Sequence, residues 1–331
     1  MNINNIEIYK IGTGDSIYEI YKSKKLGTGT YSSVLLGKCI SEKKAKEIKR
    51  IDKLVAIKKI NIANLSTNGA KMLTTEIEIM KEMINYSHPN IIKCYDVIDD
   101  IDVIYIVMEY CDGGDFSSLL IKKPIKYEYI KYFFQQIIKA MFFLHNNEII
   151  HRDIKPKNIL ILNKEKILKL ADFGFAKHLD TFKRTLTVCG SPLYMAPEIY
   201  QKVGYTEAVD VWSLGIILYE MVYGKHPLND CIDPKTLANF VMNDDIYIPE
   251  NKYVDKSCLD LLKKMLKRKE ADRITIEKLF CHPWIQEKWD ISNIVGSIYR
   301  EVDNDSSDMS SSDSDNSDED IGFLFNFDVR R

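Results

Sequence analysis

The chain carries the run HRDIKPKN at residues 151–158, followed by the triplet DFG that begins at Asp172. These runs supply an acid, a lysine, an amide and a second acid at the spacing that phosphoryl transfer requires. Asp153 can accept the proton of a substrate hydroxyl, and Lys155 can lie against the transferring phosphate. Asn158 and Asp172 can hold magnesium ions that neutralise the phosphate oxygens. The pattern is long and has few free positions, so a polar loop that carries these residue types by chance explains it poorly.

A glycine-rich run, GTGTYSSV at residues 27–34, follows a stretch that predicts a β-strand. Gly27 and Gly29 let backbone N–H groups approach phosphate oxygens without a Cβ in the way. Alone, this run fits a glycine hairpin better than a phosphate site. The earlier Gly12-Thr13-Gly14 is a decoy, because no suitable strand follows it at the right distance. No GxxxxGK[ST] run occurs, which disfavours a P-loop ATPase.

Three further runs complete the pattern: VAIK at residues 55–58, MEYC at residues 108–111 and GSPLYMAPE at residues 190–198. With the runs above, they resemble the eukaryotic protein kinases over residues 20–285. The resemblance implies an α+β, bilobal fold with a small β-rich N-lobe and a larger helical C-lobe. It also implies ATP and Mg²⁺ as cofactors and protein Ser/Thr hydroxyls as acceptors. Lys155 and the GSPLY run match the serine/threonine type rather than the tyrosine type.

The resemblance assigns roles to individual residues. Lys58 would hold the α and β phosphates of ATP and pair with a glutamate on a helix. Glu76 is favoured as that partner. Glu78 is the competitor, but on a helix its side chain would point about 200° away from that of Glu76. Asp153, Lys155 and Asn158 would be catalytic, and Asn158 and Asp172 would bind the metal. The nucleotide-binding set is Gly27, Thr28, Gly29, Val34, Ala56, Lys58, Glu76, Glu109, Cys111, Asp115 and Leu160.

At the predicted hinge, the backbone of Glu109 and Cys111 would meet the adenine edge, with Met108 as gatekeeper. Asp115 would contact the ribose, although it could instead cap the next helix. Other residues would serve as framework: Ser191 would contact Asp153 and Lys155, Glu198 and Arg273 would form a buried ion pair, and Asp210 would anchor the catalytic loop.

One subfamily is similar in more detail. The runs VMEYCDGGD at residues 107–115, FQQI at residues 134–137 and VCGSPLYMAPE at residues 188–198 are similar to the unc-51-like, autophagy-initiating kinases. This similarity is confined to the catalytic domain. A role in autophagy is therefore an analogy at the level of the family.

Periodicity predicts where the secondary structure lies. Strands are expected at residues 18–26, 34–40, 54–60 and 104–109. Residues 41–53 form a basic connector that is longer than a hairpin needs. Helices are expected at residues 74–84, from residue 130 onward and at residues 209–223.

The expected domains are an N-terminal extension (1–19), the catalytic domain (20–285), a linker (286–300) and a tail (301–331). Residues 301–320 hold nine acidic residues and no basic ones, so this segment cannot bury a core and is expected to be disordered. Residues 321–327, near the end of the sequence, carry alternating phenylalanines that would share one strand face and could dock on a partner or on the kinase body.

Composition fits a soluble protein with 45% hydrophobic and 28% charged residues. Seven scattered cysteines without a CxxC spacing argue against a disulfide framework and a zinc site. No signal peptide or membrane span is expected, so the predicted location is cytoplasmic. Protein substrates are the expected partners, nucleic acid is not, and the oligomeric state stays open.

An active serine/threonine kinase is the leading hypothesis. A pseudokinase that acts as a scaffold is the alternative, and the intact Lys58, Asp153 and Asp172 disfavour it. A tyrosine kinase is disfavoured by Lys155. Activity is predicted to depend on phosphorylation of Thr187, with Thr185 as the competitor, because Arg152 and Lys177 would offer positive charge to a phosphate.

Overall fold

The structure of the chain is a computed structural model. The structure describes residues 7–29, 32–63, 65–122, 124–162, 166–178, 189–229, 231 and 233–287. The predicted acidic tail and the predicted phosphorylation sites Thr185 and Thr187 lie outside these residues.

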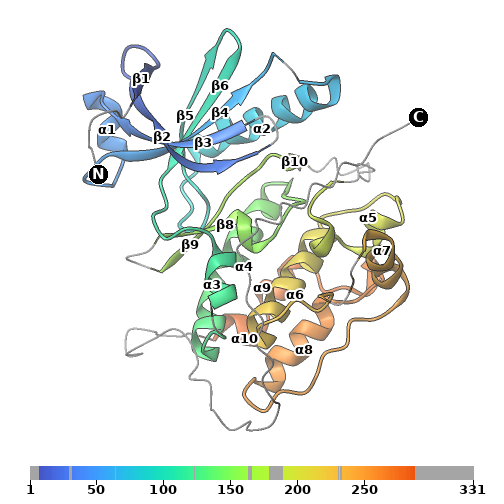
Figure 1. Cartoon of the computed structure of the whole chain (residues 1–331). Helices are drawn as coiled ribbons and strands as arrows, with labels where there is room; N and C mark the ends of the chain where they lie inside the picture. Colours follow the sequence, from blue (N-terminus) through green and yellow to red (C-terminus); the bar gives the residue numbers. More distant parts are fainter. Residues whose placement is uncertain are drawn as a thin grey trace, which may run out of the picture. The chain divides into compact units, whose positions relative to one another are not determined.

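A six-stranded antiparallel sheet forms the N-lobe (Figure 1). Its strands are β1 (Ile8–Ile11), β2 (Tyr18–Thr28), β3 (Ser32–Cys39), β4 (Leu54–Asn61), β5 (Cys94–Asp100) and β6 (Val103–Glu109). They lie in the order β1-β2-β3-β4-β6-β5. The four predicted strands correspond to β2, β3, β4 and β6, whereas β1 and β5 were not predicted.

The long helix α2 (Thr67–Asn85) packs on one face of this sheet, against β5. It begins earlier than the predicted Thr74, because the side chain of Ser66 caps it by accepting a hydrogen bond from the Gly69 N–H at 3.1 Å. Because side chains alternate between the two faces of a strand, every second side chain of β4 and β6 faces α2. Ile60 of β4 and Ile106 of β6 join the same hydrophobic core as α2.

A second hydrophobic core lies on the other face of the sheet, and we call it the outer core. Val55 and Ile57 of β4 belong to it, together with Tyr18 and Ile20 of β2. Ile11 of the edge strand β1 and Ile48, just after the short helix α1 (Glu42–Glu47), also belong to it, and Figure 1 shows α1 and α2 on opposite sides of the N-lobe. Residues 7–19 of the N-terminal extension and the connector, residues 41–53, are therefore folded parts of the N-lobe.

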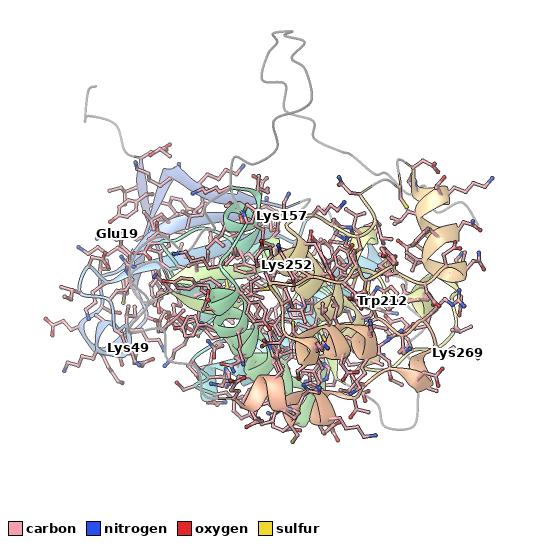
Figure 2. All side chains as sticks on the ribbon, turned by 90° about the horizontal axis from the view of Figure 1, so that it is seen from below. Glu19, Lys49, Lys157, Trp212, Lys252 and Lys269 are labelled. Carbon is pink, nitrogen blue, oxygen red and sulfur yellow. The ribbon has the colours of Figure 1, made fainter. Side chains whose placement is uncertain are left out.

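The C-lobe is helical. Its helices are α3 (Phe116–Lys122), α4 (Tyr127–Asn146), α5 (Pro197–Tyr200), α6 (Ala208–Tyr223), α7 (Pro234–Asn243), α8 (Lys256–Met265), α9 (Ile276–Phe280) and α10 (Pro283–Gln286). The predicted apolar helix is α6, which is buried along nearly its whole length, and its Trp212 lies among the other C-lobe helices (Figure 2). The predicted α+β, bilobal fold is confirmed. Within the described residues, none of the helices is both long and apolar enough to cross a bilayer.

Short strands and one-turn 3₁₀ helices occupy the segments that connect the larger elements. The strands are β7 (Ile149–Ile150), β8 (Ile159–Leu162), β9 (Ile167–Leu170) and β10 (Lys177–His178), and the 3₁₀ helices are η1 (Pro156–Asn158), η2 (Pro192–Tyr194) and η3 (Glu270–Asp272). β8 pairs with β9, and β10 pairs with β7. The HRDIKPKN run thus lies between β7 and β8.

The outer core makes a testable prediction about stability. Ile48 of the connector is 1% exposed within this core, whereas Ile51 is 98% exposed. Replacing Ile48 with Ala should lower the free energy of unfolding by about 2–5 kcal/mol, because it removes buried methyl groups and leaves a cavity. Ile51→Ala is the matched control and should change it by less than about 0.5 kcal/mol. Chemical denaturation measures both, and equal effects would show that the connector does not belong to the core.

Candidate active site

Lys58 on β4 meets two acids from different elements. Its Nζ lies 2.6 Å from Oε1 of Glu76 on α2 and 3.2 Å from Oδ1 of Asp172. Glu76 is buried, whereas Glu78, the competitor from the sequence, is exposed. The contact thus joins the sheet, α2 and the DFG run at one point.

The charges in this cluster support one another. Burial by itself would lower the pKa of Lys58, but the carboxylates of Glu76 and Asp172 outweigh it and raise that pKa. Burial would likewise raise the pKa of Asp172, but the Lys58 ammonium outweighs it and lowers that pKa. Lys58 and Asp172 are therefore both charged at neutral pH, as phosphate and metal binding require.

The catalytic loop, residues 151–158, surrounds the carboxylate of Asp153. Lys155 Nζ donates to Asp153 Oδ2 and to Ser191 Oγ, at 2.7 Å each. Ser191 Oγ donates to the other carboxylate oxygen at 2.9 Å. The Asn158 amide donates to the carbonyl of Asp153 at 2.8 Å and to its Oδ2 at 2.9 Å. Asp153 is 3% exposed and is held in one orientation by three side chains.

Asp210 of α6 holds this loop from inside the C-lobe. Its fully buried carboxylate accepts the backbone N–H groups of His151 and Arg152, each at 2.9 Å. His145 Nε2 lies 2.9 Å from the same carboxylate. Burial alone would raise the pKa of Asp210, but these hydrogen bonds and the neighbouring imidazoles hold it below its ordinary value. Arg152 has a φ of 67°, a left-handed conformation that this anchoring sustains.

The glycine-rich residues lie where β2 turns into β3. Gly27 is opposite Val34 in the β2–β3 register, and the Gly29 N–H donates to the Ser32 carbonyl at 2.8 Å. A Cβ on Gly29 would come within 2.8 Å of Ser32 Oγ, so a side chain there would crowd the turn. Thr28 ends β2. Within the described residues, no hydrogen bond joins this turn to the catalytic loop.

The hinge, residues 108–114, continues from β6. Ala56 of β4 lies opposite Met108 in the sheet register. The Glu109 N–H already donates to the Lys93 carbonyl at 2.8 Å. Of the Glu109 backbone groups, the carbonyl oxygen is therefore the one left for the predicted hydrogen bond to adenine. Cys111 follows and packs against the hydrophobic core to which α2 belongs.

Asp115 caps α3, which was the alternative to a ribose contact. Its Oδ1 accepts the Ser118 N–H at 3.0 Å, and the Ser117 hydroxyl donates to the same oxygen. Asp115 also forms an isolated antiparallel bridge with Leu160 of β8, which places both predicted nucleotide residues side by side.

The donor set fits a magnesium ion bound together with a nucleotide. Asn158 uses its amide N–H groups on Asp153, which leaves its Oδ1 as an oxygen ligand, and Asp172 supplies a charged carboxylate. Mg²⁺ is usually held by one or two protein oxygens, with phosphates and waters completing its octahedron. The part of the chain that the structure describes contains no cluster of three or more His, Cys, Asp or Glu side chains that would hold a metal without such help.

The other framework residues also meet. Arg273 forms a two-point ion pair with Glu198, at 2.7 and 3.0 Å, and its guanidinium lies 5.3 Å from the Trp212 ring centre. Two contacts were missed from the sequence: His145 on Asp210, and Lys169 of β9 on the Glu109 carboxylate at 2.9 Å. Neither residue lies in a recognisable run, and only the tertiary fold reveals its partner.

A half-buried acid, Glu220, lies next to the GSPLY run. The Tyr194 hydroxyl lies 3.1 and 3.0 Å from the two carboxylate oxygens of Glu220 on α6. Burial raises the pKa of Glu220 from 4.5 to about 7, although the Tyr194 hydrogen bond opposes this shift. No lysine or arginine of the described residues forms a salt bridge with Glu220.

Comparison with known proteins gives the same assignment as the geometry. A family model described as "Protein kinase domain" matches residues 20–285. Human "Serine/threonine-protein kinase ULK3" is 39% identical over 265 residues, which cover 80% of this chain and 54% of that protein.

Two further relatives extend the comparison. "Serine/threonine-protein kinase atg1" of Dictyostelium discoideum is 38% identical over 271 residues, which cover 79% of this chain and 38% of that protein. Human "SNF-related serine/threonine-protein kinase" is 34% identical over 284 residues, which cover 84% of this chain and 35% of that protein. The chain thus spans about half the length, or less, of these curated relatives.

Glu220 predicts how stability changes with pH. The unfolded chain releases this proton near pH 4.5, whereas the folded chain keeps it up to about pH 7. Stability from this group is therefore greatest below pH 4.5 and falls as the pH rises to 7, by about 2–3 kcal/mol in total. Glu220→Gln keeps an acceptor for Tyr194 but cannot ionise. Denaturation at pH 5 and pH 8 should show a smaller loss for Glu220→Gln than for wild type, and parallel profiles would contradict the prediction.

Proposed function

We propose, because this chain belongs to the protein kinase family, that it transfers the γ-phosphoryl group of ATP to serine or threonine hydroxyls of protein substrates. The observation that carries this proposal is the pair of side-chain clusters just described. Lys58, Glu76 and Asp172 form one, and Asp153, Lys155 and Ser191 form the other. The Lys58 cluster has the charged groups that would bind the phosphates of a nucleotide and its metal ion. The Asp153 cluster has a carboxylate that would act as a base, beside the Lys155 ammonium.

Each cluster supports a separate part of the reaction. Lys58, fixed by Glu76, would bind the α and β phosphates, and Asn158 and Asp172 would hold Mg²⁺, which supplies neutralisation of phosphate charge. Asp153 would orient the acceptor hydroxyl and take its proton as the new P–O bond forms and the bond to the ADP oxygen breaks. Lys155 would lie against the transferring phosphoryl group and offset its charge. Positioning and charge neutralisation would supply most of the acceleration.

Lys155 and Ser191 support the serine/threonine class. They hydrogen-bond each other, and each also hydrogen-bonds the Asp153 carboxylate. The relatives at 34–39% identity are named serine/threonine kinases. The alternative is a pseudokinase that binds partners without transferring phosphate, and only an activity measurement separates the two.

The role of Asp153 is tested by Asp153→Asn. Removing the proton acceptor should lower turnover by about 10²-fold or more, while ATP should still raise the melting temperature because Lys58 and Asp172 remain. Phosphate incorporation into a randomised Ser, Thr and Tyr peptide array measures both activity and acceptor class. Asp99→Asn, an exposed acid on β5, is the control. Wild-type turnover in Asp153→Asn would refute the assignment, and an inactive wild type that still binds ATP would favour a pseudokinase.

Regulation by phosphorylation of Thr187 is part of the proposal. Arg152 supports it, because this cation lies beside the catalytic base and its Nε bonds the Phe175 carbonyl just after DFG. Lys177, further along that segment, is exposed and adds a second positive charge. A phosphate with nearly two negative charges would pair with such cations and order the segment.

The test compares Thr187→Ala with phosphatase-treated wild type. Both should lose most of their turnover, because neither can carry the phosphate that neutralises Arg152. Thr185→Ala is the matched control and should respond to an activating kinase as wild type does. Undiminished turnover in both Thr187→Ala and the treated wild type would end the idea.

A further inference from the structure

The connector between β3 and β4 is fixed at several points along its length. The Ile17 N–H donates to the Ser41 hydroxyl at 3.3 Å, and Lys43 pairs with Asp15 at 2.7 Å, so α1 is tied to the turn after β1. Ile48 is buried in the outer core, and Lys53 Nζ donates to the Ile48 carbonyl at 2.8 Å. The chain between Ile48 and Lys53 therefore leaves the core from a fixed position.

Arg50, in that span, reaches the hinge. Its NH1 group donates to Asp112 Oδ2 at 3.0 Å, and its guanidinium lies 5.2 Å from the centre of the Tyr110 ring. The other edge of the guanidinium is occupied by Asp52, with bonds of 3.0 and 2.9 Å to Nε and NH2. Asp52 thus holds the plane of Arg50 in the orientation that serves Asp112 and Tyr110.

The hinge is held from the C-lobe as well. The Gly113 N–H donates to the Ile161 carbonyl at 2.8 Å, and a Cβ on Gly113 would come within 2.7 Å of that oxygen. The Glu109 carboxylate pairs with Lys169 of β9. Cys111 therefore lies between a residue fixed to the C-lobe on each side, and Arg50 is the contact from the connector to this same short segment.

We propose that Arg50 is a positioning residue for the nucleotide site. By fixing Tyr110 and Asp112, it holds the intervening Cys111 backbone where an adenine edge would be bound. This inference rests on the proposed function, because it takes ATP as the ligand. If the hinge is already ordered, less of the binding free energy of the nucleotide is spent on ordering the hinge. Arg50 therefore acts on ATP affinity and not on the phosphoryl-transfer step, which lies at Asp153.

Arg50→Ala should raise the KM for ATP by about three- to tenfold, the size expected from one half-exposed ion pair and one cation–π contact. The turnover number and the KM for peptide should stay within about twofold of wild type, since the catalytic cluster is untouched. Arg50→Lys should lie between the two, because lysine keeps the charge but not the planar fork. Lys49→Ala is the control: Lys49 is the exposed neighbour of Arg50 at the periphery of the N-lobe (Figure 2) and should leave the KM for ATP unchanged.

A double-mutant cycle shows whether the effect passes through the hinge. If it does, Asp112→Ala should raise the KM for ATP, and Arg50→Ala with Asp112→Ala should raise it by less than the product of the two single changes. Titration with a fluorescent ATP analogue measures affinity independently of turnover. Wild type that binds no nucleotide would refute the proposed function itself. Wild type that binds ATP, with an unchanged KM in Arg50→Ala, would overturn this inference alone, as would a loss confined to melting temperature and turnover.

Discussion

Asp210 is a fully buried carboxylate, and the catalytic loop is folded around it. Two backbone N–H groups and an imidazole converge on it, and they offset the desolvation that would otherwise make a buried charge costly. The left-handed backbone of Arg152 costs about 1–3 kcal/mol, and it is sustained because Asp210 accepts hydrogen bonds from the successive N–H groups of His151 and Arg152. The same geometry favours glycine at position 190, because a Cβ there would come within 2.6 Å of the Arg152 carbonyl oxygen.

Asp210, Asp172 and Asp153 are suited to different roles because their surroundings differ. Asp210 faces backbone donors and histidines, Asp172 faces Lys58, and Asp153 faces a lysine, a serine and an amide. Asp210 has no opening toward a ligand, so it can only support. Asp172 lies next to the residue proposed to bind phosphate, which suits a metal ligand. Asp153 is held by side-chain donors and lies beside a cation, which suits a base that takes the proton of a substrate hydroxyl.

The parts of this arrangement that were predictable are those that chemistry confines to short runs. Asp153, Lys155 and Asn158 are neighbours in sequence, and phosphoryl transfer requires these residue types together, so their convergence followed from the run itself. Strand alternation in residues 54–60 likewise placed β4 correctly. The choice between Glu76 and Glu78 rested on spacing alone, and the fold separates them by burying Glu76 against Lys58 and leaving Glu78 exposed.

What could not be predicted depends on contacts between segments that are distant in sequence. β1 is short and amphipathic, and it is a strand because β2 offers it an edge. The connector contains helix α1, which has no buried residue of its own and gains its place through Ile48 and the turn at Asp15. Likewise, nothing in the local sequence pairs Lys169 with Glu109 or Arg50 with Asp112.

Two of these unpredicted contacts, Lys169–Glu109 and Arg50–Asp112, meet at the hinge. The side chains proposed to catalyse the reaction and to bind phosphate are fixed by ion pairs and hydrogen bonds to one another. The hinge backbone carries no such charge at Cys111, so its position depends on the residues at either side. The Arg50–Asp112 ion pair, which comes from a segment outside the recognised motifs, thus adds a further fixed point between Glu109 and Gly113.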